Sequence, residues 1–148
     1  MRPKLSIIPL IAAVVVSLAL LGTPAFAAHD LSPAPEDAKV YFIAPKNGET
    51  LPQTFTAKFG LSGMGIAPAG VDRSNTGHHH LLIDQAPLPD LTEPLQVNEH
   101  IKHFGGGQTE AVLNLPPGPH TLQLLLGNAA HIPHDHPVIS PKISITVK

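Results

Sequence analysis

The sequence predicts an all-β chain, a single immunoglobulin-like β-sandwich with long His/Pro/Gly-rich loops. Several short segments alternate apolar and polar residues, which is the pattern of a half-buried strand. Proline and glycine, 17 and 12 of the 148 residues, separate these segments at a spacing typical of sandwiches. No segment has the length and 3.6-residue periodicity of an amphipathic helix.

Six segments are predicted to form strands. The clearest is residues 53–61, because Phe55, Ala57, Phe59 and Leu61 fall on one face and the residues between them are mostly polar. Each segment ends at a proline, a glycine or a polar loop, where strand pairing is expected to stop. The six are residues 39–43, 53–61, 78–84, 110–115, 120–126 and 142–147.

Two long loops interrupt the strands. Residues 62–77 carry four glycines, and residues 85–107 carry three prolines and end in the Gly105–Gly107 run. The turn at residues 116–118 predicts that the two strands beside it form a hairpin.

The N-terminus has the features of a signal peptide over residues 1–27. Arg2 and Lys4 precede the apolar residues 5–21, and residues 25–27 (Ala-Phe-Ala) fit a cleavage site. We therefore expect a periplasmic or secreted protein. An uncleaved membrane anchor is the alternative, since about 18 apolar residues can just span a bilayer.

Behind this signal, residues 28–38 are expected to be a flexible lead-in, and residues 39–148 a single β-sandwich domain. The chain has no cysteine, which excludes a disulfide framework, a thiolate metal site and a lipoprotein anchor. Acidic residues outnumber basic ones by 11 to 9 in the full sequence, and the excess grows when Arg2 and Lys4 are removed. This balance argues against nucleic acid as a partner, because nucleic acid calls for a clustered basic face.

Histidine is the strongest chemical signal. Nine of the ten histidines lie between His78 and His136, and neutral imidazole is the commonest protein ligand of Zn and Cu. We predict a metal site drawn from seven of them: His78, His80, His100, His103, His131, His134 and His136.

Strand alternation places His78 and His80 on one face, about 6.6–6.8 Å apart at Cα, and His79 on the other face with Leu81 and Ile83. Two imidazoles are too few for a tight site, so further ligands must come from the loops. His100 and His103 lie at the spacing of one helical turn. The third set, His131, His134 and His136, lies between two prolines.

The predicted ion is Cu(II) or Zn(II), because soft sulfur ligands are nearly absent. Either Asp84 or Asp135 is expected to orient the ligands, and Glu99 is a further carboxylate that could accompany the imidazoles. Affinity should then fall as the pH drops below the ordinary imidazole pKa of about 6.5.

Other uses of the histidines remain open. The rings can brace long loops by hydrogen bonds or form a pH-responsive surface. His120, which follows a Pro-Gly-Pro turn, is expected to be structural. Cleavage after Ala28 would make His29 terminal, an arrangement that resembles the histidine brace of copper proteins.

Catalytic motifs are not found. The sequence lacks G-x-S-x-G and H-E-x-x-H, and the triglycine is not followed by the lysine of a phosphate loop. We therefore expect no enzyme activity and no catalytic residues, with a metal-dependent enzyme as a minor alternative.

The chain from Val40 to Val147 resembles an uncharacterised family of exported bacterial domains, domain of unknown function 4399. The matching stretches are VYFIAPKNGE, FGLSGMGIAPAG, NTGHHHLLID, NEHIKHFGGGQTE, LPPGPHTLQLLLG and HIPHDHPVISPKISITV. The resemblance implies an exported single-domain protein and assigns no activity and no site residues.

The predicted function is therefore that of an exported domain that binds copper or zinc, as a carrier, a scavenger or a structural metalloprotein. The alternative is a non-catalytic structural or protein-interaction module of the cell envelope, with an envelope protein as partner and structural histidines. Membrane contact is expected only through an uncleaved signal segment.

Overall fold

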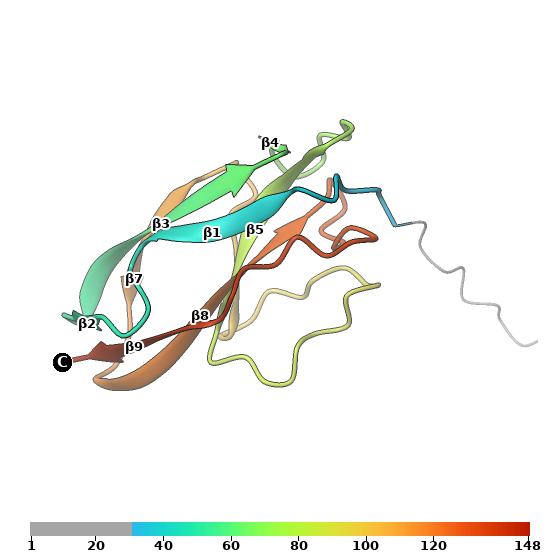
Figure 1. Cartoon of the computed structure of the whole chain (residues 1–148). Helices are drawn as coiled ribbons and strands as arrows, with labels where there is room; N and C mark the ends of the chain where they lie inside the picture. Colours follow the sequence, from blue (N-terminus) through green and yellow to red (C-terminus); the bar gives the residue numbers. More distant parts are fainter. Residues whose placement is uncertain (1–30) are drawn as a thin grey trace, which may run out of the picture.

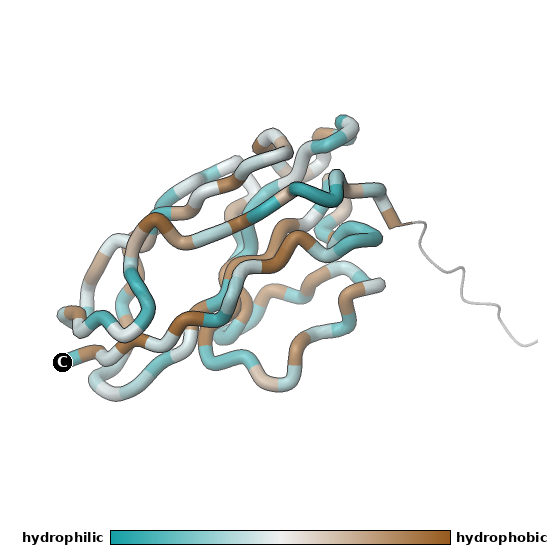
Figure 2. The backbone as a smooth tube through the Cα atoms, viewed as in Figure 1, coloured by the Kyte–Doolittle hydropathy of each residue, from teal (hydrophilic) through white to brown (hydrophobic). Residues whose placement is uncertain are grey.

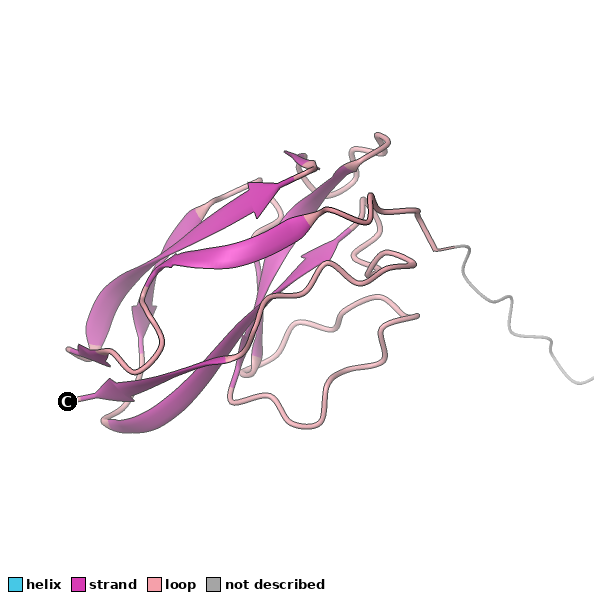
Figure 3. Ribbon diagram, in the orientation of Figure 1, coloured by secondary structure: helices cyan, strands magenta, loops and turns pink. Residues whose placement is uncertain are grey.

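The computed structural model describes residues 31–148, so the predicted signal peptide at residues 1–27 lies outside the described residues. Within this range the chain is all-β, as predicted, and Figure 3 shows strands and loops without a helix. The described residues accordingly contain no helix long and apolar enough to cross a membrane. The strands are β1 (Lys39–Ala44), β2 (Thr50–Leu51), β3 (Thr54–Ser62), β4 (Gly65–Ile66), β5 (Thr76–Ile83), β6 (Ile101–His103), β7 (Glu110–Asn114), β8 (Gly118–Gly127) and β9 (Ile143–Val147).

The strands form two sheets. The three-stranded sheet has the order β1-β3-β7 and the six-stranded sheet has the order β2-β9-β8-β5-β4, with β6 paired to β5. In Figure 1, β1 and β3 of the first sheet lie above β8 and β9 of the second. Most pairs are antiparallel, but β2 pairs β9 and β4 pairs β5 in parallel.

Alternating side chains from both sheets build one shared core. Ala57 and Phe59 of β3 point inward, as their alternation predicts, and Leu122 and Leu124 of β8 are fully buried. In Figure 2, hydrophobic residues concentrate along the strands and hydrophilic residues along the loops. Burying these side chains drives the two sheets together, at roughly 25 cal/mol per Å² of apolar surface.

A second, smaller core covers the opposite face of the six-stranded sheet. Leu82 and Leu125 point away from the shared core and pack against Leu95 of the long loop at residues 84–100 and against Ile101. This loop runs below the sheet in Figure 1. Both faces of β5 are therefore buried, which explains why its residues read as a continuous apolar and histidine run.

The predicted hairpin at residues 116–118 is wrong. β7 pairs with β3 in one sheet, whereas β8 pairs with β5 and β9 in the other. Pro116 and Pro117 have no N–H group to close a tight turn, and the segment carries the chain from one sheet to the other.

The remaining predictions about the fold differ in outcome. All six predicted strands are present, within two residues at each end, whereas the short strands β2, β4 and β6 were not predicted. The immunoglobulin-like arrangement and the domain boundaries stay predictions. Part of the expected lead-in lies against the C-terminal half of the chain, since the Ser32 carbonyl accepts a hydrogen bond from the Asp135 N–H at 3.0 Å.

Candidate metal centre

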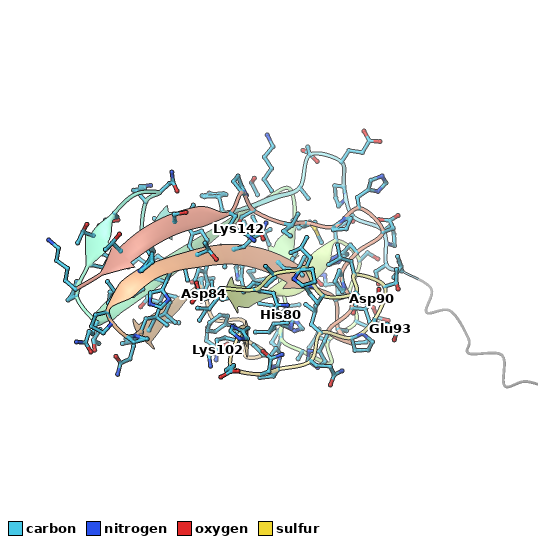
Figure 4. The ribbon with its side chains drawn as sticks, turned by 90° about the horizontal axis from the view of Figure 1, so that it is seen from below. His80, Asp84, Asp90, Glu93, Lys102 and Lys142 are labelled. Atoms are coloured by element: carbon cyan, nitrogen blue, oxygen red, sulfur yellow. The ribbon has the colours of Figure 1, made fainter. Side chains whose placement is uncertain are left out.

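The site begins on β5, where strand alternation sends His78 and His80 to the outer face of the six-stranded sheet. Both side chains are fully buried, because the loops cover this face. Their partners on β8 are Gly127 and Leu125. A Cβ atom at Gly127 would lie only 2.7 Å from Cε1 of His80, so the absence of a side chain there makes room for the imidazole. Figure 4 shows His80 in the middle of this face.

His103 reaches the same point from β6, a strand of three residues. The β5–β6 register places His103 directly opposite His80, so the two rings share one face. The Nε2 atom of His103 lies 3.1 Å from Nε2 of His78. An added Cβ atom at Gly105 would overlap the ring of His103, so this glycine is needed for the ring to take its place.

His131 comes from the loop after β8. Its Nδ1 atom lies 3.1 Å from Nε2 of His78, and its backbone has a φ of 67°, in the left-handed region. Its carbonyl accepts a hydrogen bond from the Leu95 N–H at 3.0 Å, which ties the loop of His131 to the loop at residues 84–100.

Together His78, His80, His103 and His131 form what we call the four-histidine cluster. One ligand atom from each lies within 4.8 Å of the others. In a tetrahedral site with metal–nitrogen distances of 2.0–2.1 Å, the ligand nitrogens are about 3.3 Å apart. The two 3.1 Å separations around His78 are already close to that value. The residues present therefore fit a transition-metal ion.

Hydrogen bonding alone accounts poorly for this packing. Nε2 of His78 faces a nitrogen of both His103 and His131, but one imidazole nitrogen makes one in-plane hydrogen bond as donor or as acceptor. Neither ring nitrogen of His80 has a hydrogen-bond partner among the described residues, and both are buried. A bound ion would give each ring one partner that the protein does not supply.

The electrostatics of the cluster favour neutral imidazole, the form that binds metals. Burial, together with repulsion from the neighbouring His103 and His131, lowers the pKa of His78 to about 4. Burial, followed by repulsion from His78, likewise lowers the pKa of His80 to about 3. The pKa of His103 is also lowered, first by burial and then by His131. His78, His80 and His103 are therefore neutral at pH 7 and can bind a cation through their ring nitrogens.

Three of the seven predicted ligands lie elsewhere. The ring of His100 is bonded through Nδ1 to the Ile83 carbonyl at 2.9 Å, and its Nε2 lies 3.6 Å from Glu99. His136 is exposed beside Asp135. His134 is buried and lines a separate small cavity of about 120 Å³, and its Nδ1 has no hydrogen-bond partner in the part of the chain that the structure describes. None of the three belongs to the cluster.

Neither predicted orienting carboxylate contacts the cluster. Oδ2 of Asp84 lies 2.7 Å from Nδ1 of His120, and Oδ1 accepts a hydrogen bond from the Thr121 N–H at 2.7 Å. Oδ1 of Asp135 accepts hydrogen bonds from the N–H groups of Ala34 and His136. These two carboxylates therefore stabilise loops and a strand end rather than the orientation of a ligand.

His79 occupies the inner face of β5, as strand alternation predicts. Its ring packs against Phe59 with the centroids 5.3 Å apart, and neither nitrogen has a hydrogen-bond partner within residues 31–148. Burial lowers the pKa of His79, although the backbone of Gln108 and Gly60 lies near enough to oppose that effect. A neutral ring in the core is therefore its state, and it is separated from the cluster by the sheet itself.

Similarity to known proteins is limited. A family model described as Domain of unknown function (DUF4399) matches residues 57–148, the range that holds the whole cluster. No curated protein matches the chain significantly. A solved structure, the endo-β-1,4-mannanase from Thermotoga petrophila, is similar with a TM-score of 0.44 and 22% identity over 76% of this chain. The match spans 20% of the length of that enzyme.

Proposed function

This chain belongs to the family Domain of unknown function (DUF4399), whose description states no activity, and we propose that it binds one transition-metal ion, Cu(II) or Zn(II), through the four-histidine cluster. The observation that carries the proposal is the convergence of four imidazoles from β5, β6 and the loop after β8. Residues so far apart in the chain meet only because two strands pair and one loop folds over them.

The donor set supports copper or zinc over harder cations. Four neutral imidazoles suit Zn(II) and Cu(II), whereas Mg²⁺ and Ca²⁺ prefer oxygen ligands. The chain has no cysteine, and its one methionine in the described range, Met64, packs against the shared core. A soft Cu(I) site is therefore not supported.

A carrier or scavenger role is supported by the uneven burial of the ligands. His78 and His80 are fully buried, but His103 and His131 are only half-buried. The ion would therefore be reachable from the side of His103 and His131.

We place this role in the periplasm or outside the cell, on the signal-peptide features of residues 1–27. We also retain the immunoglobulin-like sandwich, because two largely antiparallel sheets enclose one core.

The test is metal binding by the chain without residues 1–27 and without a histidine tag. We expect one equivalent of copper or zinc to remain after dialysis, and His131→Gln to weaken binding by about 100-fold or more. His100→Gln is the matched control, because His100 lies outside the cluster. Failure to retain metal, or equal losses in the two variants, would overturn the proposal. The first of these outcomes would favour the envelope interaction module, with the histidines as internal braces.

A further inference from the structure

His131 is the cluster residue with the least support from regular structure. It lies on a loop, and its φ of 67° falls in the left-handed region, which residues other than glycine rarely adopt. Surrounding contacts must therefore hold the backbone in this state.

Those contacts converge on Asn128. Its side-chain Oδ1 accepts hydrogen bonds from the N–H groups of Ala130 at 2.9 Å and Ile132 at 3.1 Å. Its backbone N–H donates to the Ile132 carbonyl at 2.9 Å, and its carbonyl accepts from the His131 N–H at 2.9 Å. One asparagine thus closes the turn on both sides of His131, as Asn side chains do in loops.

The side chain of Asn128 is itself held at the protein surface. Its Nδ2 donates to Oγ of Ser32 at 2.9 Å, and both residues line a surface cleft with Asp72 and Ala129. Asn128 is half-buried and belongs to neither hydrophobic core. Truncating it removes hydrogen bonds without opening a cavity in a core.

We propose that Asn128 is the positioning residue that holds His131 as the fourth ligand of the metal. This inference rests on the proposed function. Asn128 touches no metal, and it acts only by fixing the left-handed turn that directs His131 toward His78. Its effect on affinity should therefore disappear when His131 is no longer a ligand.

A double-mutant cycle with Zn²⁺ or Cu²⁺ tests this. We expect Asn128→Ala to raise the Kd by about 10–100-fold, the range typical of residues that orient a ligand. In the His131→Gln background the same change should alter the Kd by less than about 2-fold. Equal losses in both backgrounds, or an unchanged Kd in Asn128→Ala alone, would overturn the proposal.

Two further variants separate positioning from general stability. Asn128→Asp keeps the Oδ1 acceptor for the N–H groups of Ala130 and Ile132, so its metal affinity should be close to that of the wild type. If Asn128→Asp binds metal as weakly as Asn128→Ala, the Oδ1 bonds do not hold His131. Asn47→Ala removes one loop hydrogen bond, to the Ser144 N–H, and should leave the Kd unchanged.

A metal-free measurement distinguishes failure of this inference from failure of the proposed function. The Leu95 N–H donates to the His131 carbonyl, so its hydrogen exchange reports whether the turn is in place. We expect about 10-fold faster exchange at Leu95 in metal-free Asn128→Ala. If the wild-type protein binds no metal, the proposed function fails. Unchanged exchange at Leu95 would show that Asn128 does not hold His131.

Discussion

Burial gives His78 and His80 a protonation behaviour unlike that of ordinary histidines. With pKa values of about 4 and about 3, both rings stay neutral through the range in which an exposed imidazole becomes charged. The unfolded chain has no such environment and takes up protons near pH 6.5. Folding and protonation of these two residues therefore oppose each other in mild acid.

The metal-free protein should consequently lose stability as the pH falls below 6.5. The loss continues down to the folded-state pKa of each residue, about 4 for His78 and about 3 for His80. Between pH 6.5 and 5 we expect a loss of roughly 1–2 kcal/mol for each histidine, because the unfolded state binds more protons in this window. Urea unfolding with a chelator present, at several pH values, measures this loss. A His78→Gln/His80→Gln double variant should show a flatter dependence, whereas exposed His136→Gln should not. Equal slopes in all three proteins would contradict the prediction.

The same shifts alter the expected pH dependence of metal binding. In a site of four imidazoles of ordinary pKa, the metal ion would compete with about four protons below pH 6.5. With His78 and His80 still neutral there, at most the other two cluster histidines take up protons. We expect log Kd to change by no more than about two units per pH unit between pH 7 and 5, measured by titration in weakly coordinating buffers. A slope near four would show that burial does not lower these pKa values.

Asp84 and His120 form a separate charged clamp between the ends of β5 and β8. Burial lowers the pKa of His120, but its bonds to the Asp84 carboxylate and the Pro116 carbonyl outweigh that and raise it. Both ring nitrogens face acceptors, so the doubly protonated ring fits best. This stabilisation is present below pH 6.5 and is lost as the pH rises through the raised pKa of His120.

Asp84→Asn should therefore destabilise the protein by about 1–2 kcal/mol in urea unfolding at pH 6. Metal affinity should not change, because the bonds of Asp84 go to His120 and Thr121 and not to the cluster. A weaker metal affinity with unchanged stability would restore the orienting role expected from the sequence.

Among the elements, β5 contributes both to the core and to the four-histidine cluster, because both of its faces are covered. Its inner face contributes His79, Leu81 and Ile83 to the packing between the sheets, and its outer face presents His78 and His80 to the loops. The neighbouring elements leave space where imidazoles must fit, at Gly127 of β8 and at Gly105 after β6.

Gly105→Ala should weaken metal binding by about 10-fold or more without removing a ligand. The added methyl group would overlap the His103 ring and displace it from His78. Gly106→Ala is the matched control, because a methyl group there meets the flexible side chain of Gln108 at 2.9 Å. Comparison of the two Kd values is the measurement, and equal Kd values would mean that Gly105 does not set the position of His103.

At the scale of the whole molecule, a bound ion would join β5, β6 and the loop after β8. Ligands that bind only the folded state stabilise it by about 2.7 kcal/mol at 100 times the Kd. For a domain of this size that corresponds to a rise in Tm of roughly 10 °C. Thermal unfolding with and without Zn²⁺ or Cu²⁺ measures the shift, and His131→Gln should reduce it. An unchanged Tm at saturating metal would contradict selective binding to the folded protein.

Strand prediction succeeded where side-chain alternation was strong and failed where pairing was short. β3 alternates over nine residues and was predicted almost to the residue, while β6 has three residues and too little pattern to detect. β6 nevertheless brings His103 to the site. The hairpin at residues 116–118 was predicted wrongly because a turn motif does not reveal which sheet the next strand joins.

The sequence by itself determined the all-β class, the wealth of histidine and the shared face of His78 and His80, because strand periodicity and composition are local properties. Only the tertiary structure decided which loop histidines meet that pair. His103 depends on the pairing of β6 with β5, and His131 on a left-handed turn folded back over the sheet. His100, His134 and His136 have the same chemistry but different positions. Ligand selection thus depends on long-range pairing and loop packing, which no local pattern encodes.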